Sequence, residues 1–352
     1  MDYHTHSHRG SAIYLDGLRL CPIRTFHYRD GRAGEENSKR KHSILFVADV
    51  PHSHLNHLGC FMSLTIAVFI QGIVVLALAP LVTGLVRWFK ARLQGRHGAA
   101  PWLVYFTLLT TLKKENVISE SRSWVFRCVP FVVLGIALFL SLTLPIVFPS
   151  GGIPQVDLFV LAGVLALSSV FLVLGGLDAA TAFGGMGASR EMTIAALIEP
   201  TTLITFATFA SVAGSSSLQD IFGNGITVIS HPALLLSFVA LVLIVLAENA
   251  RYPVDNPATH LELTMVHEAM VLEYSGPYLA MLEYASSIKL TVFLLILGNL
   301  VGAGLLTTVV IGSFALALFE STIAKMRFFR MQEYMSIAFF LALAGLILIF
   351  II

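Results

Sequence analysis

The sequence predicts an all-α, polytopic integral membrane protein with about eight transmembrane helices. Of its 352 residues, 56% are hydrophobic and only 12% are charged, and the mean hydropathy is +0.82. Soluble domains carry about a quarter charged residues. The apolar residues also occur in long uncharged stretches, and a spanning helix needs about 20 of them. The third observation is the distribution of Lys and Arg, which alternates from one connection to the next.

Each uncharged stretch of sufficient length is interpreted as one span. The stretch 290–319 holds the end of one span and most of the next, and its glycines, at Gly298, Gly302 and Gly304, mark the turn between them. The expected spans are residues 63–86, 125–148, 157–178, 191–213, 231–249, 277–300, 303–324 and 332–352.

The basic residues predict how these spans are oriented. Fourteen Lys and Arg residues follow position 61, and eight of them lie in the first connection, 87–127. The third, fifth and seventh connections (178–191, 249–276 and 325–331) also carry basic residues, whereas the second, fourth and sixth carry none. Cytoplasmic connections are enriched in Lys and Arg. The odd-numbered connections are therefore expected in the cytoplasm, with both ends of the domain outside the inner membrane.

Residues 1–61 differ in composition from the rest of the chain. They hold eight of the 22 basic residues and eight of the twelve histidines. Alternating histidines can chelate metal, so a metal-binding tail is one interpretation. The favoured interpretation is a disordered or mispredicted extension ahead of Met62, because the tail would place eight positive charges outside. The membrane domain is then residues 62–352.

The first connection is a candidate docking surface for a soluble partner. It opens with a basic stretch and continues with a short interfacial helix, expected at 105–114. An ordinary positive-inside anchor is the alternative, but about forty residues are more than an anchor requires. The candidate docking residues in this stretch are Arg87, Lys90, Arg92 and Arg96.

The third connection and the fourth span contain three candidate proton carriers, Asp178, Glu191 and Glu199. The glycine-rich segment 183–191 permits tight turns, and Ser189 is a plausible N-cap for the span. Glu199 lies within about a quarter-turn of Glu191 on a helical wheel. A carboxylate inside a span marks either a hydrogen-bonded group of the bundle or a proton path.

Ten ionisable residues lie between the fifth and sixth apolar stretches. They are Glu248, Arg251, Asp255, His260, Glu262, His267, Glu268, Glu273, Glu283 and Lys289. A short helix is expected over 257–275, followed by a stop at Gly276. Two histidines at this spacing could ligate a metal, but no third ligand follows, so a buried polar network or proton relay is favoured. Glu248, Glu262, Glu268 and Glu273 join the proton-path candidates, while Arg251 and Asp255 are candidate docking residues.

This charged segment resembles the eight-span membrane protein that respiratory complex I shares with membrane-bound nickel–iron hydrogenases. The resemblance rests on residues 248–289, supported by the basic stretch 90–96 and by 183–191, and it covers about 63–352. The sequence Val-Asp-Asn-Pro-Ala-Thr-His-Leu-Glu is similar to the formate hydrogenlyase branch. Asn256, Thr259 and His260 depart from the acid-rich continuation of the quinone-reducing branch, which argues against a quinone site.

The resemblance implies a subunit without a catalytic site that clamps a hydrogenase arm to the membrane and carries part of a proton path. The implied partners are hydrogenase large and small subunits, an iron–sulfur ferredoxin-like subunit and antiporter-like membrane subunits. Nickel–iron and iron–sulfur centres are expected in those partners, because the cysteines of this chain, Cys21, Cys60 and Cys128, form no cluster-binding motif. A quinone-chamber subunit of a complex I-like NADH dehydrogenase and a freestanding transporter are the alternatives.

Overall fold

A computed structural model describes residues 53–118, 122–143, 156–223, 227–228, 231, 234–251, 266–323 and 328–351, with side chains from Val68 onward except those of 328 and 329. The chain divides into two compact units, 1–63 and 64–352, and only the second is described below. Eleven helices and no strand occur in these ranges; Asp157 and Ser217 form an isolated bridge. The all-α prediction is confirmed.

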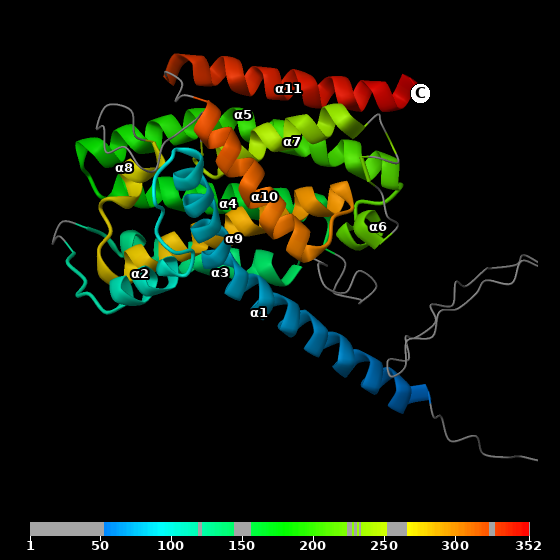
Figure 1. The fold of residues 1–352 in the computed structure, drawn as a ribbon, viewed down its shortest axis with the longest axis horizontal. Helices are drawn as coiled ribbons and strands as arrows, with labels where there is room; N and C mark the ends of the chain where they lie inside the picture. The colour runs from blue at the N-terminus through cyan, green and yellow to red at the C-terminus, as the bar shows by residue number, and fades with distance from the viewer. Residues whose placement is uncertain are drawn as a thin grey trace, which may run out of the picture. The chain divides into compact units, whose positions relative to one another are not determined.

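The helices are numbered in chain order (Figure 1). They are α1 (Ser53–Leu93), α2 (Leu103–Leu112), α3 (Trp124–Thr143), α4 (Leu158–Asp178), α5 (Ala182–Ala213), α6 (Leu218–Gly223), α7 (Leu235–Glu248), α8 (His267–Val271), α9 (Gly276–Val301), α10 (Leu305–Thr322) and α11 (Phe328–Ile351).

Seven of the described helices are long and apolar enough to cross a membrane, namely α1 from Val68, α3, α4, α5, α9, α10 and α11. The expected fifth span, 231–249, corresponds to α7, which has 14 residues and a length of about 21 Å. That length falls short of the roughly 30 Å of a hydrocarbon core. The chain is a multi-pass membrane protein, and the eighth crossing rests on this short helix.

Two expected boundaries were wrong. The fourth span was expected from residue 191, but α5 begins at Ala182, where the Thr181 hydroxyl accepts a hydrogen bond from the Gly184 amide at 3.1 Å. The segment 183–191 is therefore helix rather than connection. The helix expected over 257–275 is described only from His267, and there it ends at Val271. Residues 252–265, including His260, lie outside the described residues.

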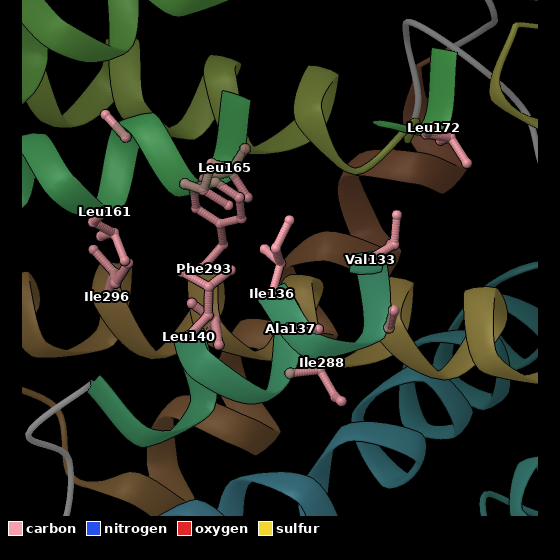
Figure 2. Packing of buried hydrophobic residues seen from close by; sticks show 14 of the residues in the cluster. Val133, Ile136, Ala137, Leu140, Leu161, Leu165, Leu172, Ile288, Phe293 and Ile296 are labelled. Atoms are coloured by element: carbon pink, nitrogen blue, oxygen red, sulfur yellow. The ribbon is translucent and has the colours of Figure 1, made fainter. Parts of the chain in front are cut away.

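Helix α9 forms the centre of the bundle. It contacts α2, α3, α7 and α10, and Gly302, with φ +78°, ends it in a left-handed conformation that favours glycine. Figure 2 shows Ile288, Phe293 and Ile296 of α9 packed among apolar side chains of α3 and α4. On the other side of the bundle α11 lies along α5 and α7 (Figure 1).

The contacts place the first, third and fifth connections together at one end of the bundle. Ser123, before α3, donates to Asp178, the last residue of α4, and Arg122 pairs with Glu273, before α9. At the opposite end the Val228 amide donates to the Leu300 carbonyl. The first of these ends, which also holds Arg87, Lys90 and Arg251, is called the basic end below.

Candidate functional site

The basic end contains a large cavity of about 620 Å³. Side chains of α1, α2, α8 and α9 line it, together with the residues that follow α7. Its charged lining consists of four basic residues and three carboxylates, Arg87, Lys90, Arg96, Arg251, Glu268, Glu283 and Glu320. Arg87 and Glu283 are exposed to the space of this cavity although they belong to apolar helices. The cavity is therefore a compartment with a strongly charged lining inside an apolar bundle.

Glu320 of α10 holds two of these basic residues. The Lys90 Nζ lies 2.9 Å from Glu320 Oε2, and an Arg251 guanidinium nitrogen lies 3.2 Å from Glu320 Oε1. The Glu320 side chain is 1% exposed, whereas those of Lys90 and Arg251 are 19% and 12% exposed. Because a buried carboxylate needs partners, these three residues fix the ends of α1, α7 and α10 to one another.

Arg122 joins the start of α3 to the start of α9. It donates to a Glu273 carboxylate oxygen at 2.6 Å and to the Glu273 carbonyl at 2.8 Å. The guanidinium also lies 4.2 Å from the ring centroid of Phe126, which stacks on Tyr274 at 4.0 Å. Burial raises the pKa of the Tyr274 hydroxyl, so this side chain stays neutral. Glu273 thus holds a structural contact at the basic end.

Asp178 caps helix α3. Its carboxylate accepts hydrogen bonds from the Ser123 hydroxyl at 2.6 Å, the Ser123 amide at 3.1 Å and the Phe126 amide at 3.2 Å. The first amides of a helix have no partner within it, and a carboxylate there also interacts favourably with the helix dipole. These three bonds give Asp178 a clear structural role.

A small central cavity of about 40 Å³ contains an ion pair between two helices of the membrane. Lys289 of α9 lies 2.7 Å from Glu248, the last residue of α7, and the Ser169 hydroxyl donates to the same carboxylate oxygen at 3.3 Å. The side chains of Lys289 and Glu248 are 17% and 11% exposed. Glu191 also lines this cavity. It shares lining residues, among them His267, with the large cavity, so the two are neighbours.

A third cavity, of about 220 Å³, continues from Glu248 towards the surface between α4 and α5. It shares Ser169 and Glu248 with the central cavity and adds Glu199. Glu199 is exposed on the surface of the isolated chain, beside Phe159 and Leu203, which are 44% and 43% exposed. The three cavities therefore form a series from the basic end to a carboxylate on the outer face of a spanning helix.

The structure brings together most of the predicted proton-path residues. Glu191, Glu199 and Glu248 line the central and third cavities, and Glu268 lines the large one. Asp178 and Glu273 hold structural contacts at the same end. Glu262 lies outside the described residues.

The candidate docking residues fall into two groups. Lys90 and Arg251 are tied to Glu320 inside the chain, and Arg87 faces the large cavity. Arg92 and Arg96 are exposed, and the Arg92 guanidinium lies 5.4 Å from the ring centroid of Trp88. Asp255 lies outside the described residues. Arg92 and Arg96 are thus exposed outside the Glu320 ion-pair cluster, and Arg96 also lines the large cavity.

Sequence reasoning missed Arg122 and Glu320 and gave Lys289 no role. The signal for Glu320 was present, because it is the only charged residue in the expected span 303–324. No group of three or more His, Cys, Asp or Glu residues suited to a metal ion occurs within the described ranges.

Ion pairs and charged cavities lie inside this apolar helical bundle. The chain is therefore a multi-pass membrane protein that holds ionisable side chains within its membrane domain, and such side chains usually mark function. The chain belongs to the NADH dehydrogenase family, whose model matches residues 64–352. The resemblance to the membrane protein shared by complex I and the hydrogenases, and to its formate hydrogenlyase branch, is confirmed.

Two relatives from Escherichia coli are similar to this chain. Formate hydrogenlyase subunit 4 is 30% identical over 281 residues, which cover 73% of this chain and 90% of the relative. Hydrogenase-4 component C is 31% identical over 236 residues, covering 65% of this chain and 73% of that one.

The fold is similar to that of a chain in the membrane-bound sulfane sulfur reductase, an archaeal respiratory membrane complex. The TM-score is 0.71, the sequence identity is 18%, and the match covers 80% of this chain and 99% of the other.

Proposed function

We propose that this chain is the membrane-anchoring, proton-path subunit of a formate hydrogenlyase-type nickel–iron hydrogenase complex. The observation that carries the proposal is the series of cavities, which brings Glu191, Glu248 and Glu199 into one line from the basic end. The two similar Escherichia coli proteins support the hydrogenase assignment, because both are named as parts of hydrogenase systems.

The contacts of Glu248 suit a proton carrier. While Glu248 is ionised, Lys289 and the Ser169 hydroxyl compensate its charge. Glu248 also lies where the central and third cavities meet, and the third cavity leads from it to Glu199.

The exposed position of Glu199 is evidence for a partner subunit that covers the outer face of α4 and α5 within the membrane. A charged group exposed to lipid at mid-membrane costs roughly 2.5–3.5 kcal/mol, so its exposed position between Phe159 and Leu203 requires protein or water beside it. We assign this face to an antiporter-like membrane subunit that accepts the proton. The other partners in the proposal are the hydrogenase large and small subunits and a ferredoxin-like iron–sulfur subunit, which contain the nickel–iron and iron–sulfur centres.

A quinone-chamber subunit of a complex I-like NADH dehydrogenase is the second candidate. The volume of the large cavity, about 620 Å³, favours it, because ligand sites occupy roughly 300–1,000 Å³. Such sites are lined mostly by apolar side chains, whereas this one is lined by seven charged residues. The charged lining favours an ion or proton compartment over a quinone site.

Purification of the chain in a mild detergent tests the assignment. We expect nickel, iron and hydrogenase activity to accompany it. Replacing Arg92 and Arg96 with Gln removes two exposed charges from the proposed docking surface. Exposed pairs contribute about 0.2–1 kcal/mol each, so the affinity for the arm should fall roughly 2- to 30-fold. Arg330→Gln, an exposed change on α11, is the matched control and should retain the arm.

Recovery of NADH-oxidising subunits without nickel would contradict the hydrogenase assignment and favour the second candidate. Recovery of the chain alone from membranes that contain the hydrogenase would contradict both.

The proposed orientation places the basic end in the cytoplasm, as the Lys and Arg distribution predicts. In a chain whose native cysteines are replaced by Ser, His97→Cys lies in the first connection at this end, and Ala303→Cys lies between α9 and α10 at the other. We expect an impermeant thiol reagent added to intact cells to label position 303 and not position 97. Labelling of position 97 alone would show that the orientation is reversed.

A further inference from the structure

Helix α2 carries an apolar face that no other described element covers. Trp102, Leu103, Phe106 and Leu109 are 63%, 46%, 60% and 55% exposed. Their spacing places them on one side of the helix. The opposite side, with Val104 and Leu108, is buried against the bundle and forms part of the wall of the large cavity. An exposed face of this kind marks a protein or membrane contact.

The depth of α2 identifies which contact this is. The Tyr105 hydroxyl donates to the Ala77 carbonyl of α1, and Ala77 lies 13 residues, or about 20 Å, from Lys90 along that helix. Tyr284 of α9 reaches the same level, because its hydroxyl donates to the Leu76 carbonyl at 3.1 Å. Tyr284 lies about 12 Å along α9 from the start of that helix. Tyr105 therefore reaches into the hydrocarbon layer rather than into the water above it.

The two ends of α2 agree with that depth. A Cβ on Gly84 of α1 would overlap the Pro101 carbonyl oxygen, so the start of α2 touches a spanning helix about 9 Å from Lys90. At the other end, the carbonyl of Lys114 lies against Gly276 at the start of α9. Helix α2 therefore runs from the surface at Lys114 into the membrane at Pro101.

The threonines of α2 also suit a lipid environment. The Thr107, Thr110 and Thr111 hydroxyls donate to backbone carbonyls of the same helix at 2.8, 2.7 and 2.9 Å. Their hydrogen bonds are thus satisfied without water, as hydrocarbon requires. At the surface end Lys113 and Lys114 are exposed and form no ion pair within the described part of the chain.

We infer that the outer face of α2 is a lipid-binding surface. Acyl chains of an anionic phospholipid pack on Trp102, Phe106 and Leu109, and its phosphate headgroup contacts Lys113 and Lys114. The helix then separates the charged large cavity from the lipid. In this arrangement the soluble arm docks on Arg92, in the last turn of α1, and on Arg96, just after that helix, and leaves α2 to the membrane. The inference does not depend on the identity of the complex.

Photocrosslinking in native membranes tests the acyl-chain contact. A benzophenone analogue of phenylalanine is introduced at position 106, and the same analogue at position 117 is the control, because Val117 is 75% exposed beyond the two lysines. After irradiation of membranes that contain the full chain, we expect a phospholipid adduct at position 106 and none at position 117. A crosslink from position 106 to another polypeptide, or an equal lipid yield at both positions, would overturn the inference.

Lipid selectivity tests the headgroup contact. Each lysine near an anionic surface contributes about 1 kcal/mol, so Lys113→Gln and Lys114→Gln should each lower the preference of the purified full chain for phosphatidylglycerol over phosphatidylcholine roughly fivefold. Lys113→Arg with Lys114→Arg keeps the charge and should keep the preference. An unchanged preference in the double Gln variant would contradict the headgroup site.

Discussion

Glu320→Gln should destabilise the folded chain by about 3 kcal/mol. The change removes the charge that both Lys90 and Arg251 contact, and breaking a buried ion pair by deleting one partner costs roughly 3–5 kcal/mol. The lower end applies here because Lys90 and Arg251 retain 19% and 12% exposure and face the large cavity. Reversible unfolding in mixed detergent micelles measures the change in the free energy of unfolding.

Two variants show whether the loss comes from the unpaired cations. Glu333→Gln is the same chemical change at an exposed position of α11, and it should alter stability by less than about 0.5 kcal/mol. Replacing Lys90, Arg251 and Glu320 together with Met, Met and Leu removes every charge of the cluster. Apolar replacement of a whole buried cluster is often neutral or stabilising, so this variant should recover most of the loss. If Glu320→Gln changed the free energy of unfolding no more than Glu333→Gln does, the account of the ion-pair cluster would be contradicted.

Much of the fold could be predicted from the sequence because a membrane span needs only a long apolar stretch. The start of α5 could not be, since its glycines resemble those of a loop. In the structure they allow close approach between elements: a Cβ on Gly184 would lie 2.5 Å from the Gly176 carbonyl oxygen, and one on Gly187 would lie 2.9 Å from that of Val266. Small residues such as glycine allow helices to pack closely in membranes. Whether a glycine-rich segment is a loop or a packed helix depends on the segments that lie against it in space, which the sequence does not show.

The sequence could predict which charged residues belong to the candidate site, but not which of them form ion pairs with one another. Charged residues in an apolar bundle mark function, which is why Glu199 and Glu248 could be selected from the sequence. Which groups neutralise one another depends on tertiary contacts between residues far apart in the chain, such as Lys90 with Glu320. For that reason Lys90 and Arg251 were assigned to a partner surface, whereas the structure pairs them inside the chain.

The second large effect is expected at Glu248. Glu248→Gln keeps the shape and a hydrogen-bond acceptor for Ser169 but cannot carry a proton, and it leaves Lys289 without the carboxylate 2.7 Å away. Loss of a positioned proton-transfer group lowers a rate by about 100-fold or more. We expect proton transfer through the membrane domain to fall on the order of 100-fold, while the soluble arm keeps its activity with artificial electron carriers.

Two further variants separate proton transfer from charge imbalance. Glu248→Gln combined with Lys289→Met removes both charges and should still fail to transfer protons, because no titrating group remains at that position. Asp178→Asn is the control. It replaces the charge-assisted hydrogen bonds that Asp178 accepts at the start of α3 with weaker neutral ones, but Asp178 lies outside the three cavities. It should lower stability while the proton yield per turnover stays unchanged.

The most direct test of a proton path through this chain is the pH gradient formed per hydrogen molecule in sealed inverted vesicles that contain the complete complex. Glu199→Gln with Glu248→Gln should leave the complex assembled and the arm active with artificial carriers, while the gradient per hydrogen molecule falls to the level measured with an uncoupler. A full gradient in this double variant, at matched assembly, would contradict the proton path and leave the chain a passive anchor.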